Sequence, residues 1–168
     1  MLSLFIVFGL CISDHRKRRK NYLLFEKKYI TLMKFSYVIP MGIYIYTIIN
    51  LKKIYIYDYL GLVIAIVSLI ILLKAKQDLG EYHVWTGYQN YETKLITDGI
   101  YSYLRHPIYL SIYLYTVVCM LTILSHSTWY LILIFILLMS YILGFLYLAA
   151  IKEEKELIKI FGKKYKKY

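Results

Sequence analysis

The stretch "IYLSIYLYTVVCMLTILSHSTWYLILIFILLMSYILGFLYLAAI", Ile108–Ile151, contains two long apolar runs that are separated only by the residues SHST. The first run covers Ile108–Leu124 and the second covers Trp129–Ile151. Each is close to the roughly 20 apolar residues that a membrane-spanning helix needs. Because so short a connection returns the chain antiparallel to itself, the stretch predicts a helical hairpin that crosses the membrane twice.

Three further apolar runs precede this hairpin, and they cover Met1–Ile12, Tyr29–Asn50 and Tyr59–Leu73. The first is short, since its length as a helix is only about 18 Å. It is expected to cross as a short or tilted helix, with partial insertion as the alternative. In the second run, Pro40 and Gly42 predict a kink. Since 60% of the whole chain is hydrophobic, the expected fold class is an all-α integral membrane protein with about five transmembrane helices.

The C-terminal tail, "KEEKELIKIFGKKYKKY" from Lys152 to Tyr168, is polar but keeps an apolar periodicity. Leu157, Phe161 and Tyr165 recur at helical spacing, while lysines occupy the other positions. This pattern predicts an amphipathic helix that lies on the membrane surface.

The formal net charge of the chain is +11. In a soluble protein this excess would point to nucleic acid. Here the basic residues flank the apolar runs, so the expected partner is the lipid bilayer with its anionic headgroups, and no nucleic acid. Cytoplasmic segments of membrane proteins carry the excess of Lys and Arg. Five spans then place the N-terminus outside and the C-terminus in the cytosol. The basic residues of the two segments assigned to the cytosol are Arg16, Lys17, Arg18, Arg19, Lys20, Lys27 and Lys28, and in the tail Lys152, Lys155, Lys159, Lys163, Lys164, Lys166 and Lys167.

Several residues that can carry chemistry stand without partners at a diagnostic spacing. Cys11 and Cys119 lie inside apolar runs, and we interpret both as small buried hydrophobes. His83 and His126 have no metal-ligand spacing, so we interpret them as interfacial or solvated and expect no metal site. The sequence also contains no Gly-rich phosphate loop and no nucleophile elbow.

Polar residues from distant parts of the chain are expected to meet on the cytosolic side. A long polar segment, Lys74 to Arg105, leads directly into "RHP" at the start of the hairpin. Glu153 and Glu154 follow the end of the hairpin. Because the start of the first hairpin helix and the end of the second are neighbours, these carboxylates should lie near His106. The sequence therefore predicts a pocket at the membrane interface, open to a cytosolic ligand and to lipid.

Three segments of the C-terminal half resemble a known family. "TKLITDGIY" at Thr93–Tyr101, "RHPIY" at Arg105–Tyr109 and "EEKELIKIFGKKYKKY" at Glu153–Tyr168 occur in this order, with two spans before the last. Together they resemble the isoprenylcysteine carboxyl methyltransferase family and its broader relatives, the phospholipid N-methyltransferases. The resemblance covers about Leu79 to Tyr168.

The resemblance implies a methyltransferase that uses S-adenosylmethionine and acts on a membrane-embedded lipid or lipidated acceptor. The acceptor is either a carboxylate, as in isoprenylcysteine, or a phospholipid amine. His106 is the expected general base for an amine, and Arg105 the residue that orients an anionic acceptor, so these two are the catalytic candidates. The residues that the resemblance assigns to the cofactor are Thr93, Lys94, Leu95, Ile96, Tyr101, His106, Pro107, Ile108, Tyr109 and Glu153.

The chain is accordingly divided into residues 1–73, with the N-terminal transmembrane helices and the basic segment, and residues 74–168, the cofactor-binding half. Two positions depart from the family. Ser111 stands where the family often has glycine, and Ala149 stands where eukaryotic members have an arginine that engages substrate. The second departure weakens the case for a prenylcysteine carboxylate.

Two other functions remain as alternatives. A membrane NADPH-dependent reductase of similar architecture would need additional basic residues in the polar segment to bind the 2′-phosphate. That segment instead carries Asp78, Glu81, Glu92 and Asp98, which disfavours it. A non-enzymatic membrane interaction protein with a polybasic face would explain the charge but not the order of the motifs.

Overall fold

The computed structural model describes residues 5–7, 9, 21–84, 86–91 and 93–167. The basic cluster His15–Lys20 and most of the predicted first span, Met1–Ile12, lie outside the described residues. The elements in chain order are β1 (Asn21–Leu23), α2 (Lys27–Ser36), α3 (Val38–Ile49), α4 (Ile56–Leu79), η1 (Gly80–Tyr82), β2 (Tyr88–Asn90), η2 (Gly99–Ser102), α5 (Pro107–His126), α6 (Trp129–Phe161) and α7 (Lys163–Lys167), where η denotes a 3₁₀ turn.

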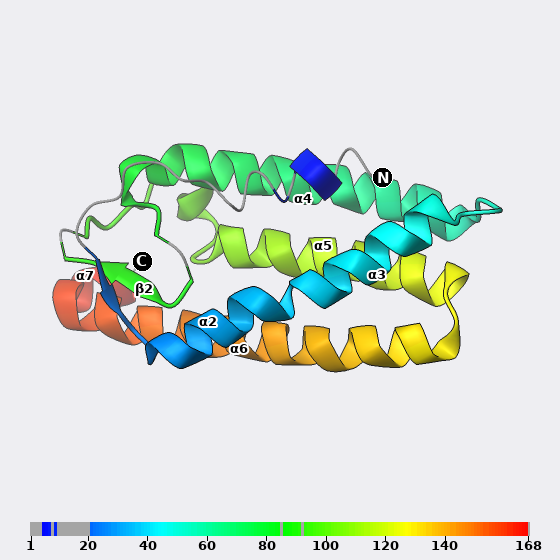
Figure 1. Ribbon diagram of the computed structural model, residues 1–168. Coiled ribbons are helices and arrows are strands. Elements are labelled where there is room, and N and C mark those ends of the chain that lie inside the picture. The colour runs from blue at the N-terminus through cyan, green and yellow to red at the C-terminus, as the bar shows by residue number, and fades with distance from the viewer. Residues whose placement is uncertain (1–4, 8, 10–20, 85, 92, 168) are drawn as a thin grey trace.

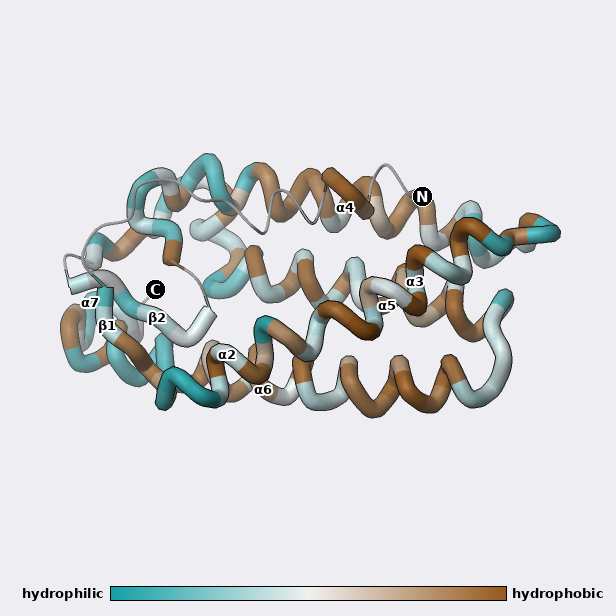
Figure 2. The backbone as a smooth tube through the Cα atoms, in the orientation of Figure 1, coloured by the Kyte–Doolittle hydropathy of each residue, from teal (hydrophilic) through white to brown (hydrophobic). Residues whose placement is uncertain are grey.

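Four helical segments of the described residues are long and apolar enough to cross a membrane: Lys27–Ile49, Ile56–Tyr82, Pro107–His126 and Trp129–Phe161. Hydrophobic residues run along all of them, and hydrophilic residues gather at the end that carries β1, β2 and α7 (Figure 2). The predicted fold class of a helical, multi-pass membrane protein is therefore confirmed, with four spans among the described residues.

Helix α5 is the central element of the bundle. Half of the residues in its most apolar stretch of 18 are buried inside the protein, compared with 22–28% in the other three spans. It runs along α4 and also packs against α3 and α6 (Figure 1). The predicted hairpin of α5 and α6 is present, and Ser127 and Thr128 join the two helices. Because α5 packs against α3, α4 and α6, side chains along its length can face the interior that these helices share.

The second predicted run is broken at Tyr37, between α2 and α3, and not at Pro40 or Gly42. Pro40 lies in the first turn of α3, where its missing N–H costs no helical hydrogen bond. Its ring would clash with the carbonyl four residues earlier, at Ser36, if the helix were continuous. The proline therefore causes the break, but upstream of its own position.

Helix α6 continues far beyond the predicted end of its span, from Trp129 to Phe161. The C-terminal tail is helical, as expected, but most of it is the last part of α6 and not a separate surface helix. Gly162, with φ of +55°, ends α6 in a conformation that disfavours other residues. Tyr165 in the following α7 is buried, so the tail also covers the protein interior.

A small antiparallel sheet, which the sequence analysis did not predict, joins two distant segments. β1 pairs with β2 so that Asn21 lies opposite Asn90 and Leu23 lies opposite Tyr88. Just after β1, the backbone carbonyl of Leu24 accepts a hydrogen bond from Lys152 Nζ at 3.0 Å. These contacts attach the chain before α2 to both the polar loop and the C-terminal part of α6.

At the opposite end of the bundle, polar side chains connect three helices. His126 at the end of α5 lies with Nε2 3.0 Å from Asp58 Oδ2 at the start of α4. Thr47 of α3 and Ser127 share a hydrogen bond of 2.7 Å. Of the two alternatives for His126, interfacial or solvated, the solvated one is wrong, because the side chain is only 7% exposed and is paired with Asp58.

Candidate functional site

A cavity of about 690 Å³ lies between the helices and reaches the polar loop. Its volume falls within the roughly 300–1,000 Å³ of small-molecule sites. Helices α2, α3, α4, α5 and α6 all contribute to its wall. Among the residues proposed from the sequence, those that line it are Thr93, Lys94, Leu95, Ile96, Tyr101, Arg105, His106, Ile108, Tyr109 and Glu153. Pro107 is buried at the first position of α5 and does not line the cavity.

Glu153 and Tyr109 form the central polar contact of the cavity wall. The Tyr109 hydroxyl, in the first turn of α5, donates a hydrogen bond to Glu153 Oε1 on α6. The antiparallel hairpin makes this contact possible between residues 44 positions apart. Tyr109 is 8% exposed, so its ring fixes the carboxylate in a largely dry environment. A carboxylate held in this way is suited to receive the ammonium or hydroxyl groups of a ligand.

His106 lies at the cavity wall immediately before α5. Its ring stacks on that of Tyr109 with the centroids 5.6 Å apart. Its Nε2 atom is 3.5 Å from Glu154 Oε1, too long for a good hydrogen bond, and is buried without a hydrogen-bond partner among the described residues. Burial lowers the pKa of His106, and this exceeds the opposing effect of Glu154, so the imidazole is neutral at pH 7.

Arg105 occupies a more open position than His106. Its Nη1 atom is 3.6 Å from Glu154 Oε1, and its guanidinium lies 5.5 Å from the ring centroid of Tyr165. The Glu154 carboxylate thus lies between Arg105 and His106, in agreement with the expectation that it lies near His106. The arrangement also places α7 against the site, since Tyr165 both lines the cavity and contacts Arg105.

The loop that carries the TKLITDGIY motif is anchored to the end of α4. Asp78 Oδ2 accepts the backbone N–H of Ile100 at 2.8 Å, and Lys74 holds the same carboxylate at 2.8 Å. Gly99 has φ of +60°, and a Cβ there would lie 2.0 Å from Asp78 Oδ2. Only glycine allows this close approach. The anchor keeps Thr93–Ile96 and Tyr101 against the cavity.

Some residues of the wall were missed in the sequence. Lys76 of α4 is 6% exposed and lines the cavity, although the sequence analysis ended this span at Leu73. Its spacing from Leu72 and Leu79, both also in the wall, was the available signal. His83, interpreted as interfacial or solvated, and Gln89, which donates to Thr93 Oγ1 at 2.9 Å, also face the cavity.

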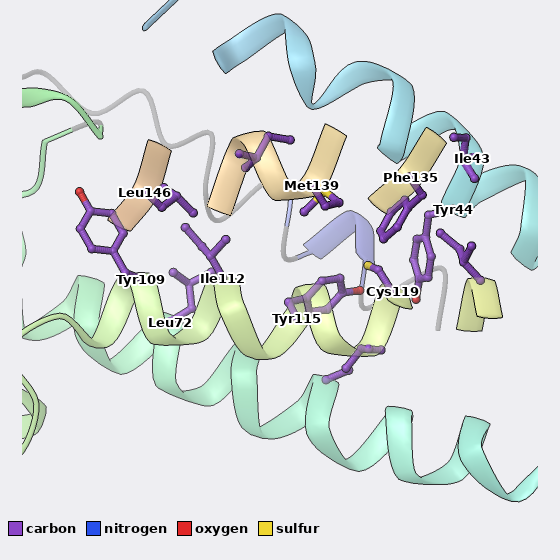
Figure 3. Packing of buried hydrophobic residues seen from close by; sticks show 14 of the residues in the cluster. Ile43, Tyr44, Leu72, Tyr109, Ile112, Tyr115, Cys119, Phe135, Met139 and Leu146 are labelled. Carbon is purple, nitrogen blue, oxygen red and sulfur yellow. The ribbon is translucent and has the colours of Figure 1, made fainter. Parts of the chain in front are cut away.

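Away from the polar loop, the cavity continues along α5 between apolar side chains. We call this part the apolar arm, and its wall includes Tyr44 of α3, Ile112, Tyr115 and Cys119 of α5, and Phe135 and Met139 of α6. Figure 3 shows these side chains following one another along α5, starting from Tyr109. The cavity thus has a polar end and an apolar arm, and it takes residues from both halves of the chain.

The four candidate membrane spans, with a cavity that has a polar end and an apolar arm between them, define the class of a multi-pass membrane protein. The sequence model of the phospholipid methyltransferase family matches residues 56–164, from the start of α4 into α7, and the chain belongs to this family. It is a membrane methyltransferase that acts on lipids. No curated protein and no solved structure matches the chain. The family match includes the polar end of the cavity but not α2 and α3, which complete the wall.

Proposed function

We propose that this protein transfers a methyl group from S-adenosylmethionine to the amine of a membrane phospholipid. The cofactor would bind at the polar end of the cavity, and the lipid would enter laterally from the bilayer. The observation that carries the proposal is the position of His106, a partly buried histidine whose ring stacks on Tyr109 of the Tyr109–Glu153 pair, at the point where the polar end meets the apolar arm.

The residues of the polar end fit this cofactor. Glu153 is the carboxylate that would accept hydrogen bonds from the cofactor's ammonium or ribose hydroxyls, and Tyr109 would hold it in place. The backbone and side chains of Thr93–Ile96, with Tyr101, would enclose the adenosine. The N-terminus of α5, with Pro107 at its first position, would favour the cofactor carboxylate.

His106 favours an amine acceptor over a carboxylate. A phospholipid amine arrives as an ammonium and must lose a proton before its lone pair can attack. His106 is neutral and can take this proton, and the Glu154 carboxylate 3.5 Å away would stabilise the resulting imidazolium. A carboxylate acceptor needs no base. Eukaryotic relatives have an arginine that engages substrate at the position of Ala149. The alanine side chain is uncharged and fully buried, so this position offers no cation to a carboxylate acceptor.

When bound, the cofactor would supply an electrophilic methyl group for transfer from its sulfonium sulfur to the amine nitrogen. The chain itself supplies alignment and a water-poor wall. The cavity also carries an excess of basic side chains: Lys34, Lys76, Lys94 and Arg105 line it together with the single carboxylate of Glu153, among the described residues. These cations complement the cofactor carboxylate and the phosphate of a phospholipid.

The proposal is tested by calorimetric binding of S-adenosylmethionine and its demethylated product to protein purified in detergent. Glu153→Ala should abolish measurable binding. Glu156→Gln is the matched control, because Glu156 lies one turn further along α6, pairs with Lys159 at 2.6 Å and does not line the cavity. Methylation should then be measured with ethanolamine phospholipids and with a prenylcysteine in mixed micelles, for the wild type and His106→Ala.

We expect methylation of the phospholipid amine and its loss in His106→Ala. Methylation of the prenylcysteine alone would reject the amine acceptor while retaining the cofactor. Binding of NADPH in place of S-adenosylmethionine by the folded protein would reject the proposed reaction altogether.

A further inference from the structure

The apolar arm has a direction and an end, which together restrict what can occupy it. Ile112, Tyr115 and Cys119 follow Tyr109 along one side of α5 at intervals of about one helical turn. Met139 and then Phe135 follow in the same direction on α6. Phe5 closes the arm from the side, with its ring centroid 4.9 Å from that of Tyr44. The arm is therefore a channel parallel to α5 that begins at the polar end.

The depth of the arm corresponds to one leaflet of a bilayer. From Tyr109 to Cys119 α5 advances ten residues, which at 1.5 Å per residue is about 15 Å. The hydrocarbon core of a typical bilayer is roughly 30 Å thick. A hydrocarbon chain whose headgroup lies at the polar end would therefore reach the end of the arm near the middle of the membrane.

The arm ends at a floor that we define by Tyr44, Cys119 and Phe135, the deepest side chains of α3, α5 and α6 that line it (Figure 3). Their exposed fractions are 1%, 6% and 1%. The next buried residues toward the far end, Thr47 on α3 and Thr122 and Ile123 on α5, pack in the protein interior and do not line the cavity. The floor is thus closed by packed helices and cannot be passed without rearrangement.

We infer that the arm holds one acyl chain of the acceptor lipid and that the floor of Tyr44, Cys119 and Phe135 limits the chain length that the enzyme accepts. This inference rests on the proposed function, and it specifies which part of the acceptor lipid binds inside the protein. The arm offers no charged side chain, matches one leaflet in depth and opens onto the proposed methyl-transfer point. An acyl chain meets all three conditions. A longer chain would have to bend or leave the headgroup short of His106.

The inference is tested with ethanolamine phospholipids of one headgroup and a graded series of saturated chain lengths in mixed micelles. kcat/KM should rise with chain length up to an optimum and then fall. Cys119→Phe adds a ring at the floor and should lower kcat/KM for the long-chain acceptors by about tenfold or more, since even one methylene in an apolar pocket changes discrimination by roughly 10- to 200-fold. The short-chain acceptors should be affected much less. Phe135→Leu should move the optimum to longer chains.

Leu133→Phe is the control, because Leu133 lies on α6 near the floor but is half exposed and does not line the cavity. Its chain-length profile should equal that of the wild type. Binding of S-adenosylmethionine is measured for every variant as the criterion of folding. If Cys119→Phe fails this criterion, Phe135→Leu decides the question alone. Variants that bind the cofactor and keep the wild-type profile overturn the chain-length inference but not the proposed function, whereas a wild type that binds no cofactor overturns the function itself.

Discussion

At the scale of single residues, Tyr109 is the side chain of the α5–α6 hairpin that contacts both Glu153 and His106 of the proposed site. Its hydroxyl donates a hydrogen bond to Glu153, and its ring stacks on His106. It can therefore orient the carboxylate and the base at once. We expect Tyr109 to act by positioning these two side chains. Removal of its hydroxyl should therefore lower the affinity for S-adenosylmethionine more than it lowers the stability of the fold.

Tyr109→Phe deletes the hydroxyl and keeps the ring. Because hydrogen bonds to charged groups contribute about 1.5–3 kcal/mol, affinity for S-adenosylmethionine should fall on the order of 10- to 100-fold. Tyr113→Phe on the same helix is the control, since Tyr113 donates to the Leu143 carbonyl at 2.8 Å and does not line the cavity. Equal affinities of the two variants, measured by calorimetry, would contradict this role of Tyr109.

The pH dependence of the reaction should report the surroundings of His106. Burial lowers its pKa, Glu154 raises it and Arg105 lowers it further. Because the proposed base is the neutral imidazole, activity should fall as the pH drops through this lowered pKa. Glu154→Gln should therefore move the acid limb of kcat/KM to lower pH, and Arg105→Met should move it to higher pH. Shifts in the same direction, or the same limb in His106→Ala, would exclude His106 as the base.

The same lowered pKa has a consequence for stability. The unfolded chain binds the histidine proton at a higher pH than the folded protein does, so the contribution of His106 to stability is complete above the ordinary histidine pKa of about 6.5. It is lost progressively as the pH falls from there toward the folded pKa.

At the scale of elements, the loop anchor is the contact that most directly couples α4 to the site. Gly99→Ala places a methyl group 2.0 Å from Asp78 Oδ2 and forces a side chain into a positive φ. Such strain costs about 1–3 kcal/mol, so the melting temperature should fall and cofactor affinity should fall with it. Gly144→Ala, in the middle of α6 with open space around its Cα, should lower neither. A Gly99→Ala protein with wild-type affinity would show that the loop does not hold the cofactor.

At the scale of the whole molecule, the distribution of basic residues predicts that the end with β1, β2 and α7 faces the cytosol. In a Cys11→Ser background, Lys155→Cys at this end should react with a membrane-impermeant maleimide only after the cells are permeabilised. Lys53→Cys, in the exposed turn between α3 and α4, should react in intact cells. The native Cys119 is 6% exposed and should not contribute. The opposite labelling pattern would invert the proposed orientation.

The parts of the structure that could be predicted are those that depend on local pattern. The apolar runs and the short SHST connection gave the α5–α6 hairpin, and the hairpin brought Glu153 close to the RHP segment. The position of the break at Tyr37 required knowing that a proline acts four residues upstream of itself. The β1–β2 pair and the pairing of His126 with Asp58 depend on contacts between distant segments, which periodicity does not contain.

Lys76 illustrates why the cavity itself could not be predicted in full. A lysine after an apolar run usually marks the end of a span, and α4 continues past it because Asp78 and Gly99 fix the following loop. Likewise, Tyr44, Phe135 and Cys119 follow the same apolar pattern as lipid-facing residues. Only packing decides which apolar side chains face a cavity and which face the bilayer.

The unbroken length of α6 has a mechanical consequence. As one rod of 33 residues, it is about 50 Å long, against a hydrocarbon thickness of roughly 30 Å, and it must tilt or protrude to fit. Glu153 and Glu154 lie in the C-terminal third of this rod, whereas Tyr109 belongs to the first turn of the shorter α5 and His106 immediately precedes it. A thicker or thinner bilayer would change the tilt of the long rod more than that of the short one and would slide the two carboxylates past the histidine. The rate of the proposed reaction would thereby depend on the thickness of the surrounding membrane.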